Sequence, residues 1–151
     1  MSILVTGTAG FIGYHVAEAL LSRGERVAGV DVVNDYYDVG LKEARLARLK
    51  RHPWFTEIRI DIADAVALDR AFAQTNPVGV IHLAAQAGVR YSVENPRAYV
   101  DSNLVGFANV LECCRAARVR HLVYASTSSV YGANQSMPFA ESQGVGHPLS
   151  L

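Results

Sequence analysis

Three glycines near the amino terminus constrain the fold of this 151-residue chain more than any other feature. Gly7, Gly10 and Gly13 stand between a short β-branched run at residues 3–5 and a segment whose apolar residues recur at helical spacing. A glycine turn between a strand and a helix lets backbone approach a pyrophosphate, and the free N–H groups of the helix then donate hydrogen bonds to it. The spacing alone also occurs in tight structural turns, so at this point both interpretations stay open.

Strands and helices alternate along the rest of the chain. Short apolar or alternating runs predict strands at residues 3–5, 26–31, 57–60, 78–84 and 121–125. Helical periodicity predicts helices at residues 11–21, 41–50 and 65–75, with Asp64 as a cap, and a longer one from Pro96 to Leu111. From Ser136 onward we expect loop. This order predicts an α/β fold, a Rossmann-type doubly wound parallel sheet that is incomplete at its carboxyl-terminal side.

A carboxylate stands where a dinucleotide site needs one. Asp31 ends the second expected strand eighteen positions after Gly13, close to the spacing of the residue that accepts hydrogen bonds from ribose hydroxyls. The same charge repels a 2′-phosphate, and no Arg or Lys follows it before Lys42. The pattern therefore favours NAD over NADP. A P-loop nucleotidase is disfavoured, because no Gly-Lys-Ser/Thr follows the glycines.

Charge and composition exclude several classes of protein. Fourteen basic and fourteen acidic side chains cancel, which leaves no basic footprint for nucleic acid or an anionic membrane. The sequence shows no signal peptide and no apolar run of about 20 residues, so we expect a cytoplasmic protein that does not span a membrane. Cys113 and Cys114 are adjacent, which suits neither a structural disulfide nor a metal site. We expect them to be buried thiols of a helix.

Several motifs resemble those of one superfamily along the whole chain. They are Gly7-x-x-Gly10-x-x-Gly13, Asp61-Ile62, His82-Leu83-Ala84-Ala85, Asn103 and the run from Ala125 to Gly132. Together they resemble the extended short-chain dehydrogenases/reductases, the NAD-dependent epimerase/dehydratase family. Three further stretches, residues 34–38, 86–92 and 130–134, resemble its UDP-glucuronate 4-epimerase branch most. One NAD-binding domain, residues 1–151, is the expected organisation.

The resemblance implies roles for individual residues. Thr127 falls on the family's catalytic Ser/Thr, and Ser128, Ser129 and Arg90 are implied substrate contacts. Without the resemblance, a polar strand-to-loop transition explains the Ser/Thr cluster better, and an exposed loop position explains Arg90 equally well. The implied cofactor-binding residues are Gly7, Gly10, Phe11, Ile12, Gly13, Asp31, Asn34, Asp61, Ile62, Leu83, Ala84, Ala85, Gln86, Asn103 and Ala125.

The chemistry implied by the resemblance is NAD-dependent epimerisation of a nucleotide sugar by transient oxidation at C4. The family's Tyr-x-x-x-Lys segment follows a run like the one at residues 147–151, so we expect the chain to stop before the catalytic helix and the substrate domain. The chain alone should then bind cofactor without turnover. Related dehydratases place Asp-Glu directly after the catalytic Thr, whereas Ser128 and Ser129 follow Thr127 here, which disfavours dehydration.

Other interpretations of the same residues stay open. A non-catalytic NAD-binding or sensing module shares every glycine and Asp31, and a 4-epimerase of another UDP-sugar shares the remaining motifs. The implied partners are a UDP-sugar and a second copy of the chain, because the helix from Pro96 supplies half of this family's usual dimer bundle. Homodimerisation or self-association is therefore expected.

Overall fold

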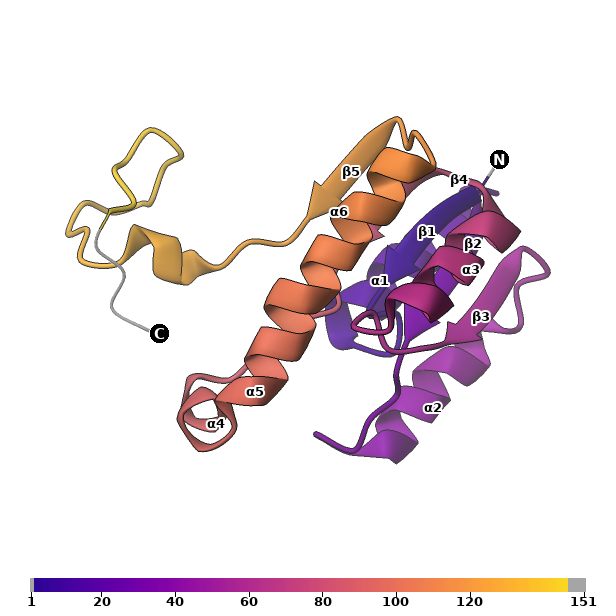
Figure 1. Cartoon of the computed structure of the whole chain (residues 1–151), viewed down its shortest axis with the longest axis horizontal. Coiled ribbons are helices and arrows are strands. Elements are labelled where there is room, and N and C mark those ends of the chain that lie inside the picture. Colours follow the sequence, from indigo (N-terminus) through magenta and orange to yellow (C-terminus); the bar gives the residue numbers. More distant parts are fainter. Residues whose placement is uncertain (1, 147–151) are drawn as a thin grey trace.

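The computed structural model describes residues 2–146, whose centre is a five-stranded parallel sheet (Figure 1). Its strands are β1 (Ser2–Thr6), β2 (Arg26–Asp31), β3 (Phe55–Arg59), β4 (Pro77–His82) and β5 (His121–Tyr124). They lie in the order β3-β2-β1-β4-β5, and each neighbouring pair is parallel. The chain runs outward from β1 to β3 and then crosses back to β4, so the direction of winding reverses between β1 and β4. This confirms the predicted Rossmann-type sheet.

Helices cover both faces of the sheet because successive strand residues point to opposite sides. On one face Leu4 and Val80 pack with side chains of α3 (Ala65–Thr75) and α6 (Phe107–Ala116). On the other face Val5 packs with side chains of α1 (Phe11–Ser22) and α2 (Val39–Leu49). Each fully buried Leu or Val contributes about 1.5–3 kcal/mol to folding. The two layers fix the carboxyl ends of β1 and β4 side by side.

Side-chain caps set the start of two helices. The Asp64 carboxylate accepts a hydrogen bond from Ala67 N at 3.0 Å, which confirms the predicted cap of α3. The Asp38 carboxylate accepts one from Gly40 N at 2.8 Å, so α2 begins at Val39, two residues before the predicted start. Lys42, in the first turn of α2, reaches the carbonyl oxygen of Asn34, which lies three residues after the end of β2.

The long helix predicted from Pro96 is not a single regular α-helix. The structure has α5 (Pro96–Tyr99), the π-helical segment η1 (Val100–Gly106) and α6, which together form one rod (Figure 1). The wider turns of η1 change the phase of the apolar row: Leu104 is 65% exposed, whereas Val110 is fully buried. The prediction of one continuous apolar side for this helix was therefore wrong.

Two short helices were missed and two other predictions hold. The missed elements are α4 (Val89–Glu94) and the 3-10 turn η2 (Ser128–Tyr131). Residues 136–146 are irregular, as predicted, and residues 125–146 extend away from the sheet beyond β5 (Figure 1). Cys113 and Cys114 are buried free thiols of α6, as expected. Within residues 2–146, no helix combines the length and apolar character that crossing a membrane requires.

Candidate cofactor site

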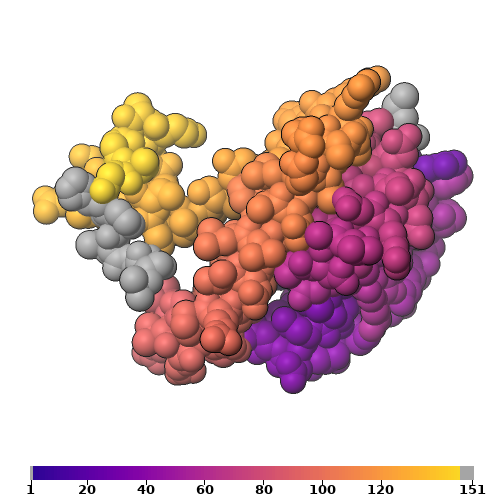
Figure 2. Space-filling model, in the orientation of Figure 1, coloured from indigo at the N-terminus to yellow at the C-terminus, as the bar shows by residue number. Residues whose placement is uncertain are grey.

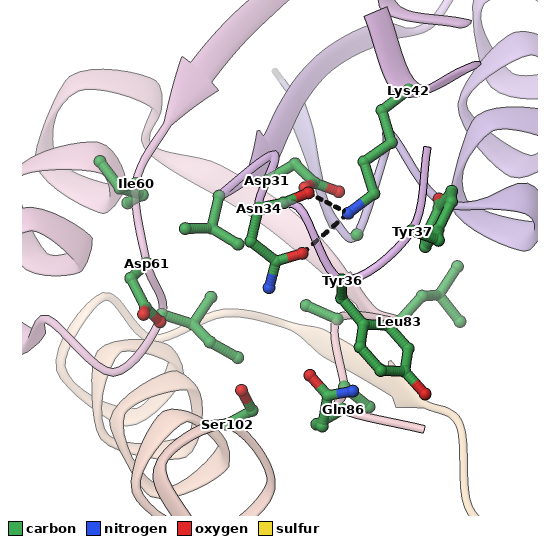
Figure 3. Close-up of a pocket in the computed structure, with 16 residues that line it drawn as sticks. Asp31, Asn34, Tyr36, Tyr37, Lys42, Ile60, Asp61, Leu83, Gln86 and Ser102 are labelled. Carbon is green, nitrogen blue, oxygen red and sulfur yellow. Dashed lines mark hydrogen bonds between the residues drawn. The ribbon is translucent and has the colours of Figure 1, made fainter. Parts of the chain in front are cut away.

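A cavity of about 160 Å³ opens at the carboxyl ends of β1 and β2, beside the point where the winding reverses. In α/β sheets, ligands bind in the crevice at this position. Figure 3 shows polar side chains around it that come from different parts of the chain, among them Asp31, Lys42, Asp61 and Gln86. We call it the cleft cavity; the residues with predicted cofactor roles that line it are Gly7, Gly10, Asp31, Asn34, Asp61, Ile62, Leu83, Ala84, Ala85 and Gln86.

The glycine turn brings backbone from three segments together. Gly7 has a φ of 76°, and a Cβ there would lie 2.9 Å from Ala84 N and from Leu83 carbonyl atoms. A Cβ at Gly13 would lie 2.0 Å from the Gly7 carbonyl oxygen, so only glycine lets α1 pack on the turn. The amino-terminal cap of α1 is Gly10, whose lack of a side chain leaves the first N–H groups uncapped. The helix end can therefore donate to an anion.

Phe11 and Ile12 follow directly in this first turn. Their side chains are 65% and 61% exposed and do not line the cleft cavity, so their role in cofactor binding stays a prediction.

Backbone amides hold the Asp31 carboxylate in place. Its Oδ2 accepts a hydrogen bond from Ala9 N at 2.9 Å, and its Oδ1 accepts one from Val33 N at 2.8 Å. Val33 has a φ of 53°, which turns the chain sharply after β2. Each carboxylate oxygen keeps a further lone pair for a ligand hydroxyl at the cleft cavity.

Helix α2 supplies two cations that the sequence prediction missed. Lys42 is 4% exposed, and its Nζ donates to the Asn34 carbonyl oxygen at 2.7 Å and to Asn34 Oδ1 at 2.8 Å (Figure 3). Burial lowers the pKa of Lys42, and the negative charge of Asp31 partly opposes that shift. Arg45 Nη1 donates to the Ala9 carbonyl oxygen at 3.0 Å. Their spacing of three residues places both on one helix face, which is the signal that would have revealed them.

Thr6, another residue absent from the predicted site, organises the loop after β4. Its buried hydroxyl accepts hydrogen bonds from Leu83 N and Ala84 N, both at 3.0 Å, and lies 2.8 Å from His82 Nδ1. Because both backbone groups are donors, the hydroxyl gives its own hydrogen to His82 Nδ1, and the ring hydrogen is on Nε2. Burial lowers the pKa of His82 to about 4, so the ring is neutral near pH 7.

Two amides of the long rod anchor the loops that border the cleft cavity. Asn103 Oδ1 accepts from Gln86 N at 2.8 Å, and its Nδ2 donates to the Gln86 carbonyl oxygen at 2.9 Å. Asn109, which the sequence prediction missed, donates from Nδ2 to the carbonyl oxygens of Ile62 and Ala63 at 2.9 and 3.1 Å. Asn103 thus shapes the cavity wall through Gln86.

A larger space of about 790 Å³, here called the outer hollow, continues from the loop after β4. Figure 2 shows the surface indented between the carboxyl-terminal segment and the helices α4 and α5. Ala125, Thr127, Ser128 and Ser129 line it together with Leu83 to Gln86. Thr127 Oγ1 accepts a hydrogen bond from Ser129 N at 3.2 Å and is exposed to the hollow. The structure therefore places the predicted catalytic and cofactor residues around two neighbouring cavities that share Leu83 to Gln86 as a wall.

Two groups near the outer hollow differ from the expectation. Arg90 lies on α4, is exposed, and is outside both the cleft cavity and the outer hollow, so its role stays a prediction. Tyr36 and Tyr99 were not singled out, yet their hydroxyls each donate to the Ala87 carbonyl oxygen at 2.8 Å. They tie the loop after β2 to the loop after β4.

Known proteins share this arrangement and much of the sequence. The model of the GDP-mannose 4,6 dehydratase family matches residues 4–150. A probable UDP-glucuronate 4-epimerase of Rhizobium meliloti (strain 1021) is 54% identical over 151 residues, 100% of this chain and 44% of that protein. UDP-glucuronate 4-epimerase 3 of Arabidopsis thaliana is 51% identical over 151 residues, 99% of this chain and 35% of that protein.

Similar solved structures include complexes with ligands. One of them is a variant of the UDP-glucuronic acid 4-epimerase of Bacillus cereus in complex with UDP-4-deoxy-4-fluoro-glucuronic acid and NAD. It matches with a TM-score of 0.85 and 35% identity, over 99% of this chain and 47% of that one. The chain spans less than half the length of each of these three relatives.

Proposed function

Because the chain belongs to the GDP-mannose 4,6 dehydratase family of NAD-dependent epimerases and dehydratases, we propose that it forms the cofactor-binding part of an NAD-dependent UDP-sugar 4-epimerase. The substrate pair that we propose is UDP-glucuronate and UDP-galacturonate. It is supported by the two relatives at 54% and 51% identity, which are named for UDP-glucuronate 4-epimerase. A 4-epimerase of another UDP-sugar is the alternative.

The observation that carries the proposal is the fixed Asp31 carboxylate at the edge of a glycine-lined cavity. NAD fits this donor and acceptor set. The uncapped first turn of α1 offers N–H groups to its pyrophosphate, and a Cβ at Gly10 would lie 3.0 Å from the Gly7 carbonyl oxygen, tighter than an ordinary contact. Asp31 offers acceptors to the adenosine ribose hydroxyls. Asp61 and Ile62 line the same cavity and would border the adenine.

In the proposed reaction this chain positions the sugar in the outer hollow. NAD held by the residues around the cleft cavity would supply reversible hydride transfer at C4. The Thr127 hydroxyl can donate a hydrogen bond to the sugar O4 while its oxygen accepts from Ser129 N, and so stabilise charge that develops on O4. Ser128 and Ser129 stand beside it on η2 and would hold the sugar.

The family model carries the name of a dehydratase, but the residues after Thr127 support epimerisation. Water elimination needs an extra acid and base next to the sugar. Ser128 and Ser129 occupy the two positions where family dehydratases have Asp-Glu, and a serine hydroxyl does not ionise near neutral pH, so it cannot replace a carboxyl group as acid or base. We therefore propose that this site catalyses inversion at C4 without loss of water.

We expect the 151-residue chain by itself to bind NAD without epimerase activity. None of its seven tyrosines is followed by a lysine four residues later, so the proton acceptor of the family mechanism is missing from the sequence. A second copy of the chain is a proposed partner, through the exposed Leu104 and Leu111 of the long rod. Light scattering that finds only monomer at high concentration would contradict this partner.

The experiment for the proposed function is a calorimetric titration of the chain with NAD, followed by an assay for UDP-galacturonate formed from UDP-glucuronate. The expected result is saturable NAD binding and no product. A matched pair of variants locates the binding: Asp31→Ala should weaken NAD affinity about tenfold or more, since it removes acceptors for two ribose hydroxyls. Asp69→Ala, on α3, should leave it unchanged. Equal affinity of the two variants would refute the proposed site.

A further inference from the structure

The adenosine end of the cleft cavity contains more positive charge than the sequence indicated. Asp31 and Arg45 bind the two backbone polar groups of Ala9. The Ala9 N–H donates to the Asp31 carboxylate, and the Ala9 carbonyl oxygen accepts from Arg45. Lys42, three residues earlier on the same helix, lines the same cavity as Asp31. One cation of α2 therefore lines the cavity with Asp31, and the second binds the residue that donates to Asp31 (Figure 3 shows Lys42 and Asp31).

Neither cation is neutralised by its immediate hydrogen-bond partners. The Lys42 ammonium has three hydrogens, and the two acceptors that it meets on Asn34 are both uncharged. Arg45 Nη1 donates to the Ala9 carbonyl oxygen and to the Tyr37 hydroxyl at 3.1 Å, which are uncharged as well. A buried ammonium without an anionic partner is costly, so these groups favour an anion in the cavity. Asp31 and Asp61 are the carboxylates that line the cavity, and the charges of Asp31 and Asp35 both act on Lys42.

We infer that this end of the cavity is a latent phosphate site, in which Lys42 and Arg45 would bind a ribose 2′-phosphate and the Asp31 carboxylate opposes its binding. The inference rests on the proposed NAD site and adds the residues that determine its selectivity. A 2′-phosphate would come to the position of the ribose hydroxyls beside Asp31, where the two negative charges repel. Without the Asp31 charge, a phosphate at that position would meet two cations whose hydrogen-bond partners are all uncharged.

The structure changes one argument for the preference for NAD over NADP. In the sequence no Arg or Lys stands between Asp31 and Lys42, but Lys42 itself lines the cavity beside Asp31. The turn at Val33 and the early start of α2 at Val39 fold that interval back on itself. Selectivity for NAD then depends on one carboxylate acting against two cations.

The test compares NAD with NADP, which differ only in the 2′-phosphate, by calorimetric titration of the whole chain. The unaltered chain should prefer NAD. Asp31→Asn keeps the shape of the side chain and removes its charge, and should shift the ratio of the two dissociation constants toward NADP by at least tenfold. Adding Lys42→Met or Arg45→Met to Asp31→Asn should each reverse most of that shift.

Arg48→Met in the Asp31→Asn background is the matched control. Arg48 lies on the same helix but pairs with Glu18 of α1 at 3.8 Å and lies over the Tyr14 ring, away from the cavity. It should change the ratio less than twofold, which separates a local effect from a general loss of positive charge.

Distinct results separate failure of the inference from failure of the proposed function. If the unaltered chain binds NAD but Asp31→Asn gains no preference for NADP, or if removing both cations has no effect, the inference is overturned alone. If the unaltered chain is folded and binds neither nucleotide, the proposed function fails and the inference with it. Should Asp31→Asn unfold, Arg45→Met with Asp31 intact must still increase the preference for NAD at least threefold, and an unchanged ratio overturns the inference.

Discussion

Replacing Thr6 by Val should destabilise the chain by about 3 kcal/mol although the two side chains have nearly the same shape. The hydroxyl of this fully buried residue makes three hydrogen bonds, with Leu83 N, Ala84 N and His82 Nδ1. A buried polar group that loses its partner costs about 1–3 kcal/mol. The Leu83 and Ala84 segment is only half-buried, so about 1 kcal/mol for each of the three groups is the appropriate estimate.

The assay is thermal and urea unfolding followed by circular dichroism. For a domain of this size, a loss of about 3 kcal/mol corresponds to a fall in Tm of roughly 6–12 °C. Thr56→Val is the matched control, because Thr56 is an exposed strand residue of β3 and its replacement should change the free energy of unfolding by less than about 0.5 kcal/mol. NAD affinity should fall as well, since Leu83 and Ala84 line the cleft cavity.

Two outcomes of the Thr6→Val experiment would contradict this role of the Thr6 hydroxyl. If Thr6→Val unfolds within about 1 kcal/mol of the unaltered chain, the hydroxyl is not the anchor of the loop after β4. If its stability falls but NAD affinity does not, the anchor exists and the loop does not contact the cofactor.

Three further predictions concern single residues. The pKa of His82 is about 4 in the folded chain and near 6.5 when unfolded, so the unfolded chain binds the extra proton between these values. The free energy of unfolding should fall by up to about 3 kcal/mol as pH drops from 6.5 to 4, and urea titrations should show a smaller fall for His82→Asn. Gly13→Ala should abolish cooperative unfolding in circular dichroism, because its Cβ would lie 2.0 Å from a carbonyl oxygen, whereas Gly144→Ala, with no atom within 4 Å of its Cβ, should be neutral. Asp64→Ala should lower the free energy of unfolding in urea by about 1 kcal/mol through loss of the α3 cap, and no change would show that the 3.0 Å contact contributes nothing.

The sheet and the glycine turn were predictable because their signals are local. The strand at residues 26–31 has the predicted bounds, since its apolar run ends at a single carboxylate, Asp31. The three glycines predict the turn because their spacing reflects steric limits that act within seven residues. The predicted end of β4 was wrong by two residues: the apolar run continues to Ala84, but pairing with β1 stops at His82, where Thr6 begins to bind the loop.

The remaining features depend on contacts between distant residues. The π-helical segment η1 has no signal in its own sequence, because Asn103 binds backbone seventeen positions away and Gly106 packs against Ile62. Likewise Lys42 and Arg45 reach the site only because α2 folds back toward Asp31. Helical periodicity predicted one regular helix from Pro96, and linear spacing did not identify Lys42 and Arg45 as site residues, because neither pattern contains information on contacts between distant segments.

The most direct test of the central claim, that this chain forms an NAD site at the carboxyl ends of β1 and β2, is amide chemical-shift mapping of the ¹⁵N-labelled chain during titration with NAD. The expected result is saturable shifts of Gly7, Gly10, Asp31, Asp61 and Ala84, the residues around the cleft cavity, with small shifts elsewhere. A well-dispersed spectrum that shows no saturable shifts, or shifts confined to residues outside this cavity, would contradict the claim.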